Sequence, residues 1–107
     1  MSESRRYTWV FAPEVVEDLR SIERKYHSLI RKRLQAQLAR EPERETRNRK
    51  PLEVPAPFGA QWELRFGPAN RFRVYYEVDP GAATVTVLAI GVKDRNVLRV
   101  GREEYGR

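Results

Sequence analysis

The chain has 107 residues, of which 34% are charged, and its 21 Lys and Arg residues against 15 Asp and Glu residues give a net charge of +6. A chain of this length (1–107) is expected to form a single domain with one modest core. Because it contains no cysteine, disulfides and thiolate metal sites are excluded. The positive balance favours a polyanionic partner such as RNA, DNA or an acidic protein segment.

No apolar stretch typical of a secretory signal follows the N-terminus. The longest apolar run, Val85–Val92, is too short to span a bilayer and fits a buried strand instead. We therefore expect a soluble, cytoplasmic protein that makes no use of a membrane.

The first part of the chain predicts one strand and then two helices. Residues 7–11 are aromatic and β-branched, and Pro13 follows at a place suited to the first turn of a helix. Two apolar stripes at helical spacing lie on either side of the His27–Ser28 junction: Val15, Val16, Leu19, Ile22 and Tyr26, then Ile30, Leu34 and Leu38. Two short antiparallel helices are expected.

Residues 41–57 carry four prolines and no apolar period, which predicts a surface loop. Alternating strands are then expected at 62–66, 71–79 and 84–92, with turns at 67–70 and 79–81. A further turn is expected at 93–96, and residues 97–100 fit either an extended segment or a short helix. This order predicts an α+β domain, in which an N-terminal strand and a two-helix hairpin pack on a mainly antiparallel, four-stranded sheet.

The strand pair places polar residues on the face opposite Trp62 and Phe72. These strand residues form a predicted basic shelf: Glu63, Arg65, Arg71, Arg73 and Tyr75. The turn after the last strand and the loop add further cations: Lys93, Arg95, Arg47, Arg49 and Lys50. Guanidinium groups bind phosphate bidentately, and a ring such as Tyr75 stacks an unpaired base. The same arginines are equally compatible with cross-strand ion pairs to Glu63 and Glu77.

Cleavage of RNA on this shelf would need a base, cations for the phosphate charge and an acid. The arginines suit the second task, Glu63 or Lys93 the first, and Tyr105 or Lys93 the third. His27 is the only histidine and has no second ligand at a recognised spacing, so we expect no metal and no cofactor.

Three segments in this order resemble the RelE/ParE superfamily of bacterial toxins from type II toxin–antitoxin modules. They are Trp62–Arg65, Arg71–Asp79 and Val87–Gly91, which together are similar to the pattern W-x-L-R … Y/F-R-V-x-Y-x-V … V-L-x-V-G. The resemblance implies a RelE-like fold and a cognate antitoxin partner, with a toxin–antitoxin hetero-oligomer as one form.

In the RelE branch, the resemblance implies cleavage of messenger RNA on the ribosome. Arg73 and Arg65 would then hold the phosphate, and Lys93 or Arg95 would supply the basic residue after the last strand. Two positions differ from that pattern, since Glu63 replaces a lysine and Arg99 falls where a tyrosine is expected, with Tyr105 six residues later.

The ParE branch has the same fold without the nuclease residues and acts by binding DNA gyrase. From the sequence we favour the ribosome-dependent endoribonuclease, with the gyrase-binding toxin as the alternative and a basic RNA-binding module as a third interpretation.

Overall fold

The computed structural model describes residues 6–105 and contains two α-helices and seven β-strands within that range. In chain order these are β1 (Thr8–Phe11), α1 (Val15–Arg20), α2 (His27–Leu38), β2 (Arg49–Pro51), β3 (Trp62–Phe66), β4 (Phe72–Asp79), β5 (Thr84–Asp94), β6 (Val97–Val100) and β7 (Glu103–Tyr105). Short 3-10 turns at Arg24–Tyr26, Pro57–Gly59 and Pro68–Asn70 join some of them. No helix in this described part of the chain is long and apolar enough to cross a membrane.

The strands form one mixed sheet in the order β2-β3-β4-β5-β6-β7, and every pair in that series is antiparallel. The first strand, β1, runs parallel to the start of β5, while β6 pairs with the end of β5. As β4 holds the other edge of β5, β1 and β6 lie one after the other along the same edge. The longest strand therefore organises the whole sheet.

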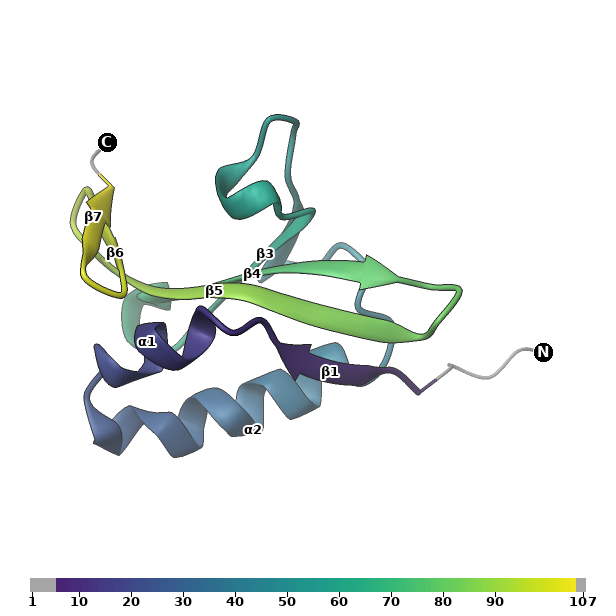
Figure 1. The fold of residues 1–107 in the computed structure, drawn as a ribbon, viewed down its shortest axis with the longest axis horizontal. Helices are drawn as coiled ribbons and strands as arrows, with labels where there is room; N and C mark the ends of the chain where they lie inside the picture. The colour runs from purple at the N-terminus through teal and green to yellow at the C-terminus, as the bar shows by residue number, and fades with distance from the viewer. Residues whose placement is uncertain (1–5, 106–107) are drawn as a thin grey trace.

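Both helices cover one face of the sheet, and the β6–β7 hairpin and the loop between β2 and β3 project from the other (Figure 1). The main core lies beneath the helices, where Ile30, Leu34 and Leu38 of α2 are almost fully buried. The strand residues predicted to share one face all join this core: Trp62, Leu64, Phe66, Phe72, Val74, Tyr76 and Val78. A smaller apolar cluster on the opposite face contains Ala60, Tyr75, Ala89 and Val100.

A β-bulge interrupts the alternation of β5. Tyr75 pairs with Ala89 and Tyr76 pairs with Val87, so Leu88 has no partner on β4. The residues that face the main core therefore change from Val85 and Val87 to Ile90. A bulge of this kind bends its strand, and the bent end of β5 carries the β6–β7 hairpin.

Gly91 follows the bulge and allows β6 to lie close to β5. A Cβ atom at this position would lie 2.7 Å from the Arg99 carbonyl oxygen and 2.8 Å from Cγ2 of Val100. Only glycine fits without moving the backbone of β6.

The predicted α+β class, the helix pair and the mainly antiparallel sheet are confirmed, but the predicted strand count of four was too low. The loop at 41–57 contains β2, which pairs with β3. Residues 97–100 are extended, and the polar tail adds β7 by pairing with them. Short polar strands of this kind show no apolar alternation, because they lie at the edges of the sheet.

The first helix is also shorter than its apolar stripe predicted, since α1 ends at Arg20. The Ser21 hydroxyl bonds to the Glu17 carbonyl oxygen, and Glu23 has an extended backbone (ψ 135°), which stops the helix. Nε2 of His27 lies 2.9 Å from the carbonyl oxygens of both Leu19 and Ile22 and donates its hydrogen there. The only histidine therefore has a structural contact at the helix junction.

Candidate functional site

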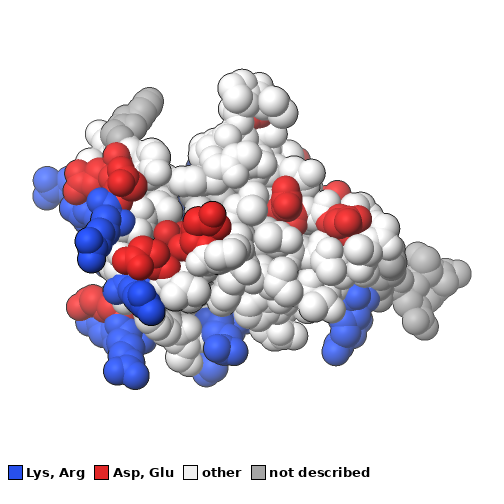
Figure 2. All heavy atoms as spheres, viewed as in Figure 1, with Lys and Arg blue, Asp and Glu red and all other residues white. Residues whose placement is uncertain are grey.

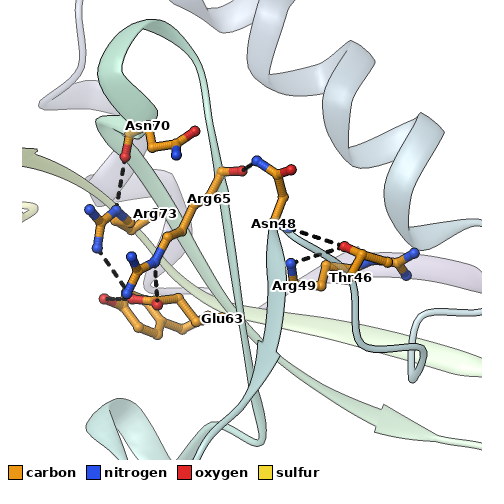
Figure 3. Close-up of polar contacts among 8 residues, drawn as sticks. Thr46, Asn48, Arg49, Glu63, Arg65, Asn70 and Arg73 are labelled. Atoms are coloured by element: carbon orange, nitrogen blue, oxygen red, sulfur yellow. Dashed lines mark hydrogen bonds and ion pairs between the residues drawn. The ribbon is translucent and has the colours of Figure 1, made fainter.

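The β3–β4 hairpin brings four of the predicted site residues together on the face opposite the helices. Glu63 pairs with Tyr75 and Arg65 pairs with Arg73 in the strand register, so their side chains leave the sheet on the same side. We call these four residues the Glu63 cluster (Figure 3). The alternation of the two strands was sufficient to predict this placement.

Glu63 is the centre of the cluster, with only 6% of its surface exposed. Nε of Arg65 donates to its Oε1 at 2.8 Å, and the Tyr75 hydroxyl donates to its Oε2 at 2.8 Å. Nη1 of Arg73 forms a longer ion pair with the same Oε2 at 3.7 Å. One carboxylate therefore serves two guanidinium groups and a phenol.

The electrostatics follow from this crowding. Burial, followed by the charge of Arg65, lowers the pKa of Arg73, while Glu63 opposes the change. Burial and then the charge of Glu63 raise the pKa of the Tyr75 hydroxyl. The Tyr75 phenol therefore keeps its proton at neutral pH and donates it in a hydrogen bond to Glu63.

Backbone contacts fix both arginines in place. Nε of Arg73 donates to the Asn70 carbonyl oxygen at 2.9 Å, within the turn between β3 and β4. The Asn48 amide group donates to the Arg65 carbonyl oxygen at 2.9 Å (Figure 3). In return, the Arg65 N–H donates to the Asn48 carbonyl oxygen at 2.9 Å. The sequence analysis missed Asn48, although the Thr46-Arg47-Asn48 turn, in which the Thr46 hydroxyl accepts the Asn48 N–H, was a signal for it.

The loop cations predicted to bind RNA do not all reach the surface. Arg47 and Lys50 are exposed, but Arg49 has only 7% of its surface exposed. Its Nη1 donates to the carbonyl oxygens of Gln37 and Glu41, so it caps the end of α2 from the core side. In this structure, therefore, Arg49 has a folding role and lies away from the shelf.

A second basic group lies beside the cluster. Arg71, Arg73, Lys93 and Arg95 surround a cavity of about 300 Å³ at the ends of β4 and β5, which we call the Arg71 hollow. Asp94 also lines this hollow and lies 3.8 Å from Nη2 of Arg71. This arrangement of four cations and one carboxylate can attract an anion.

Tyr105 lies on β7, where it pairs with Leu98 and is 43% exposed. Its ring packs edge-on against Phe58 at 5.5 Å, and Phe58 in turn contacts Tyr75 at 5.1 Å. The tail thus folds back over the sheet, and Phe58 contacts both Tyr105 and the cluster. Phe58 was another missed residue, although the Pro57-Phe58-Gly59 turn marked the position.

The fold is similar to that of a chain in a solved toxin–antitoxin complex. A chain of the crystal structure of the toxin–antitoxin complex RelBE2 from Mycobacterium tuberculosis superposes with a TM-score of 0.69 at 22% identity, covering 87% of this chain and 98% of that one. A search of curated proteins gave no match.

A comparison of the sequence with protein families identifies the family. Residues 10–97 match the family described as the ParE toxin of the type II toxin–antitoxin system parDE. The chain belongs to this ParE toxin family, which confirms the resemblance to the RelE/ParE superfamily.

Proposed function

We propose that this toxin binds DNA gyrase and inhibits it without cutting nucleic acid, and that a cognate antitoxin protein holds it inactive. Membership of the ParE family supports the gyrase target, since that branch of the superfamily acts in this way. The complex RelBE2, whose fold is similar, is a toxin–antitoxin assembly and supports the antitoxin partner.

The main support for the proposal is that both arginines of the Glu63 cluster already pair with the Glu63 carboxylate. A nuclease needs guanidinium groups that are free to meet the charge that develops on the phosphate. Arg65 and Arg73 instead share the carboxylate of Glu63, which lies where a phosphate would approach them. A phosphate would have to displace a buried carboxylate and would be repelled by it until it did so.

The proton-transfer groups support the same conclusion. Tyr75 is a donor with a raised pKa, which does not suit a base at neutral pH. Tyr105 packs against Phe58, which also contacts Tyr75. The Glu63 cluster therefore resembles an internal ion-pair network more than a set of free catalytic groups.

One observation favours the alternative, a ribosome-dependent messenger RNA endoribonuclease. The Arg71 hollow gathers Arg71, Lys93 and Arg95 around a cavity with a single carboxylate, and such a cavity could hold an RNA phosphate. The exposed cations Arg47 and Lys50 would extend this surface. Under this alternative, cleavage would require the ribosome to reorganise the cluster.

Two assays on the purified toxin separate these functions. In a supercoiling assay with gyrase, ATP and relaxed plasmid, we expect the toxin to block supercoiling. In a translation extract, we expect the messenger RNA to stay intact when its 5′ ends are mapped by primer extension. Cleaved message together with normal supercoiling would contradict the proposal and establish the endoribonuclease.

The variant Arg73→Ala sharpens the test. Loss of a phosphate-binding cation from a nuclease lowers its rate by about 100-fold or more. A gyrase binder should keep its inhibition within about threefold when it is compared with the exposed control Arg20→Ala, provided that both variants are folded at the assay temperature. A loss of activity in Arg73→Ala alone, accompanied by message cleavage in the parent, would contradict our proposal.

A further inference from the structure

A groove of about 810 Å³ lies between the beginning of α1, the bulge in β5 and the β6–β7 hairpin. Leu88, Ala89 and Val100 line it from the sheet, and the rings of Phe58 and Tyr105 line it from the two projecting segments. The bulge at Leu88 turns this side chain out of the regular strand pattern, which leaves it half-buried beside the groove. The floor of the groove and the two projecting segments are therefore apolar.

The rim of the groove is acidic. Glu14, Glu17, Asp18 and Glu103 line it, and Arg102 is the only cation of the described residues that does so. The groove thus carries a formal charge of −3, from four carboxylates and one guanidinium, in a chain whose net charge is +6. Figure 2 shows acidic side chains over α1 and over the β6–β7 hairpin, where Figure 1 places these elements.

Three of these carboxylates, those of Glu14, Glu17 and Glu103, are exposed and available to a partner, whereas Asp18 is buried and accepts the Ile90 N–H. Within residues 6–105, Glu14 and Glu103 have no cationic side chain within 4.0 Å. Glu17 has only two long ion pairs, 3.6 Å to Arg20 and 3.9 Å to Arg102, and both arginines are mostly exposed. Pairs of this length and exposure hold a carboxylate weakly.

We propose that this groove binds a positively charged amphipathic segment of a partner protein. Apolar side chains of the segment would cover Leu88, Val100 and the two rings, and its Lys or Arg residues would lie against Glu14 and Glu103. Burial of apolar area drives such binding, while the charges set its orientation and specificity. A nucleic acid does not fit here, because the rim would repel its phosphates.

This surface is separate from the Glu63 cluster and goes beyond the proposed action on gyrase. The test uses the full toxin and two synthetic helical peptides. In the first, leucines spaced alternately three and four residues apart form one apolar face, and lysines lie on both sides of that face. In the second, glutamate replaces each lysine. Backbone amide shifts in the ¹⁵N NMR spectrum locate the binding, and fluorescence anisotropy measures the affinity. Neither readout depends on gyrase.

We expect the lysine peptide to shift the amides of Leu88, Ala89 and Val100, and the glutamate peptide to leave them unchanged. The double variant Glu14→Lys/Glu103→Lys should weaken binding of the lysine peptide by about tenfold. The matched control Glu77→Lys, an exposed residue of β4 outside the groove, should leave the affinity unchanged.

Three results would overturn the proposal. Shifts confined to other surfaces would place the binding elsewhere. Equal affinity for both peptides, or for the parent and the double variant, would remove the role of the acidic rim. A toxin dimer in sedimentation that the double variant dissociates would assign the groove to a second copy of this chain.

Discussion

The role assigned to Glu63 can be tested by removing its carboxylate and measuring the free energy of unfolding. In Glu63→Ala, Arg65 and Arg73 would face each other without the shared anion, since they are direct partners in the strand register. The Tyr75 hydroxyl, which is buried, would lose its acceptor. Glu63→Gln would keep an acceptor for Tyr75 and lose only the charge.

The expected magnitude follows from the exposure of each partner. A buried hydroxyl without a partner costs about 1–3 kcal/mol, and a charged hydrogen bond contributes about 1.5–3 kcal/mol. The Arg65 contact must be discounted because this side chain is 35% exposed, whereas Arg73 is only 11% exposed. As these effects are not additive, we expect a loss of about 3 kcal/mol for Glu63→Ala and about half of that for Glu63→Gln.

Urea denaturation followed by tryptophan fluorescence would measure both values, with Trp62 next to Glu63 as an internal probe. Glu77→Ala is the matched control, because Glu77 lies on β4 and is exposed, and it should change stability by less than about 0.5 kcal/mol. If Glu63→Ala lost no more than this control, the carboxylate would not be holding the arginines, and the main argument against a nuclease would fail.

Two further predictions concern Asp18 and Gly91. Burial raises the pKa of Asp18, so the folded chain keeps this proton to higher pH than the unfolded chain, and its contribution to stability falls as the pH rises from about 4 through the raised pKa. In Asp18→Asn, the amide oxygen still accepts the Ile90 N–H, which is bonded at 3.0 Å in the parent. Thermal unfolding should therefore show a free energy of unfolding that is higher by about 1 kcal/mol at about pH 7, and this gain should disappear near pH 4. A gain that is the same at both pH values would refute this. Gly91→Ala should lower the free energy of unfolding by about 1–3 kcal/mol, because the added Cβ pushes β6 away. The control Gly81→Ala, whose Cβ would meet nothing closer than 3.5 Å, should be nearly neutral. Equal losses for the two variants in urea denaturation would contradict the close approach of β6.

Much of this fold was predictable because the apolar pattern and the burial coincide. Strands β3 and β4 alternate without interruption, so the placement of Glu63 and Arg65 on one face followed from the sequence alone. The stripe of Ile30, Leu34 and Leu38 likewise predicted the buried face of α2. In these elements one local period determines which side chains meet the core.

The rest could not be predicted because it depends on contacts between distant segments. The bulge at Leu88 shifts the faces of β5 without any turn residue to mark it. The burial of Arg49 depends on carbonyl oxygens at the end of α2, and so it cannot be recognised from its basic neighbours Arg47 and Lys50. The pairing of Glu63 with two arginines, left open beside phosphate binding, was decided only by the tertiary packing around Tyr75.

The same contacts change what the net charge of +6 implies. A sequence counts every arginine equally, but Arg49 serves backbone carbonyls in the core, and Arg65 and Arg73 serve Glu63. Arg49 is buried, and Glu63 offsets one of the two charges of Arg65 and Arg73, so these three arginines attract a polyanion less than three exposed cations would. Exposed cations remain at the Arg71 hollow, along the loop at Arg47 and Lys50, and on α2 at Arg31–Arg33, while the groove beside α1 is negative. Separate surfaces of opposite sign are suited to binding proteins at defined places, and this is a further reason for our proposal that the toxin acts on gyrase.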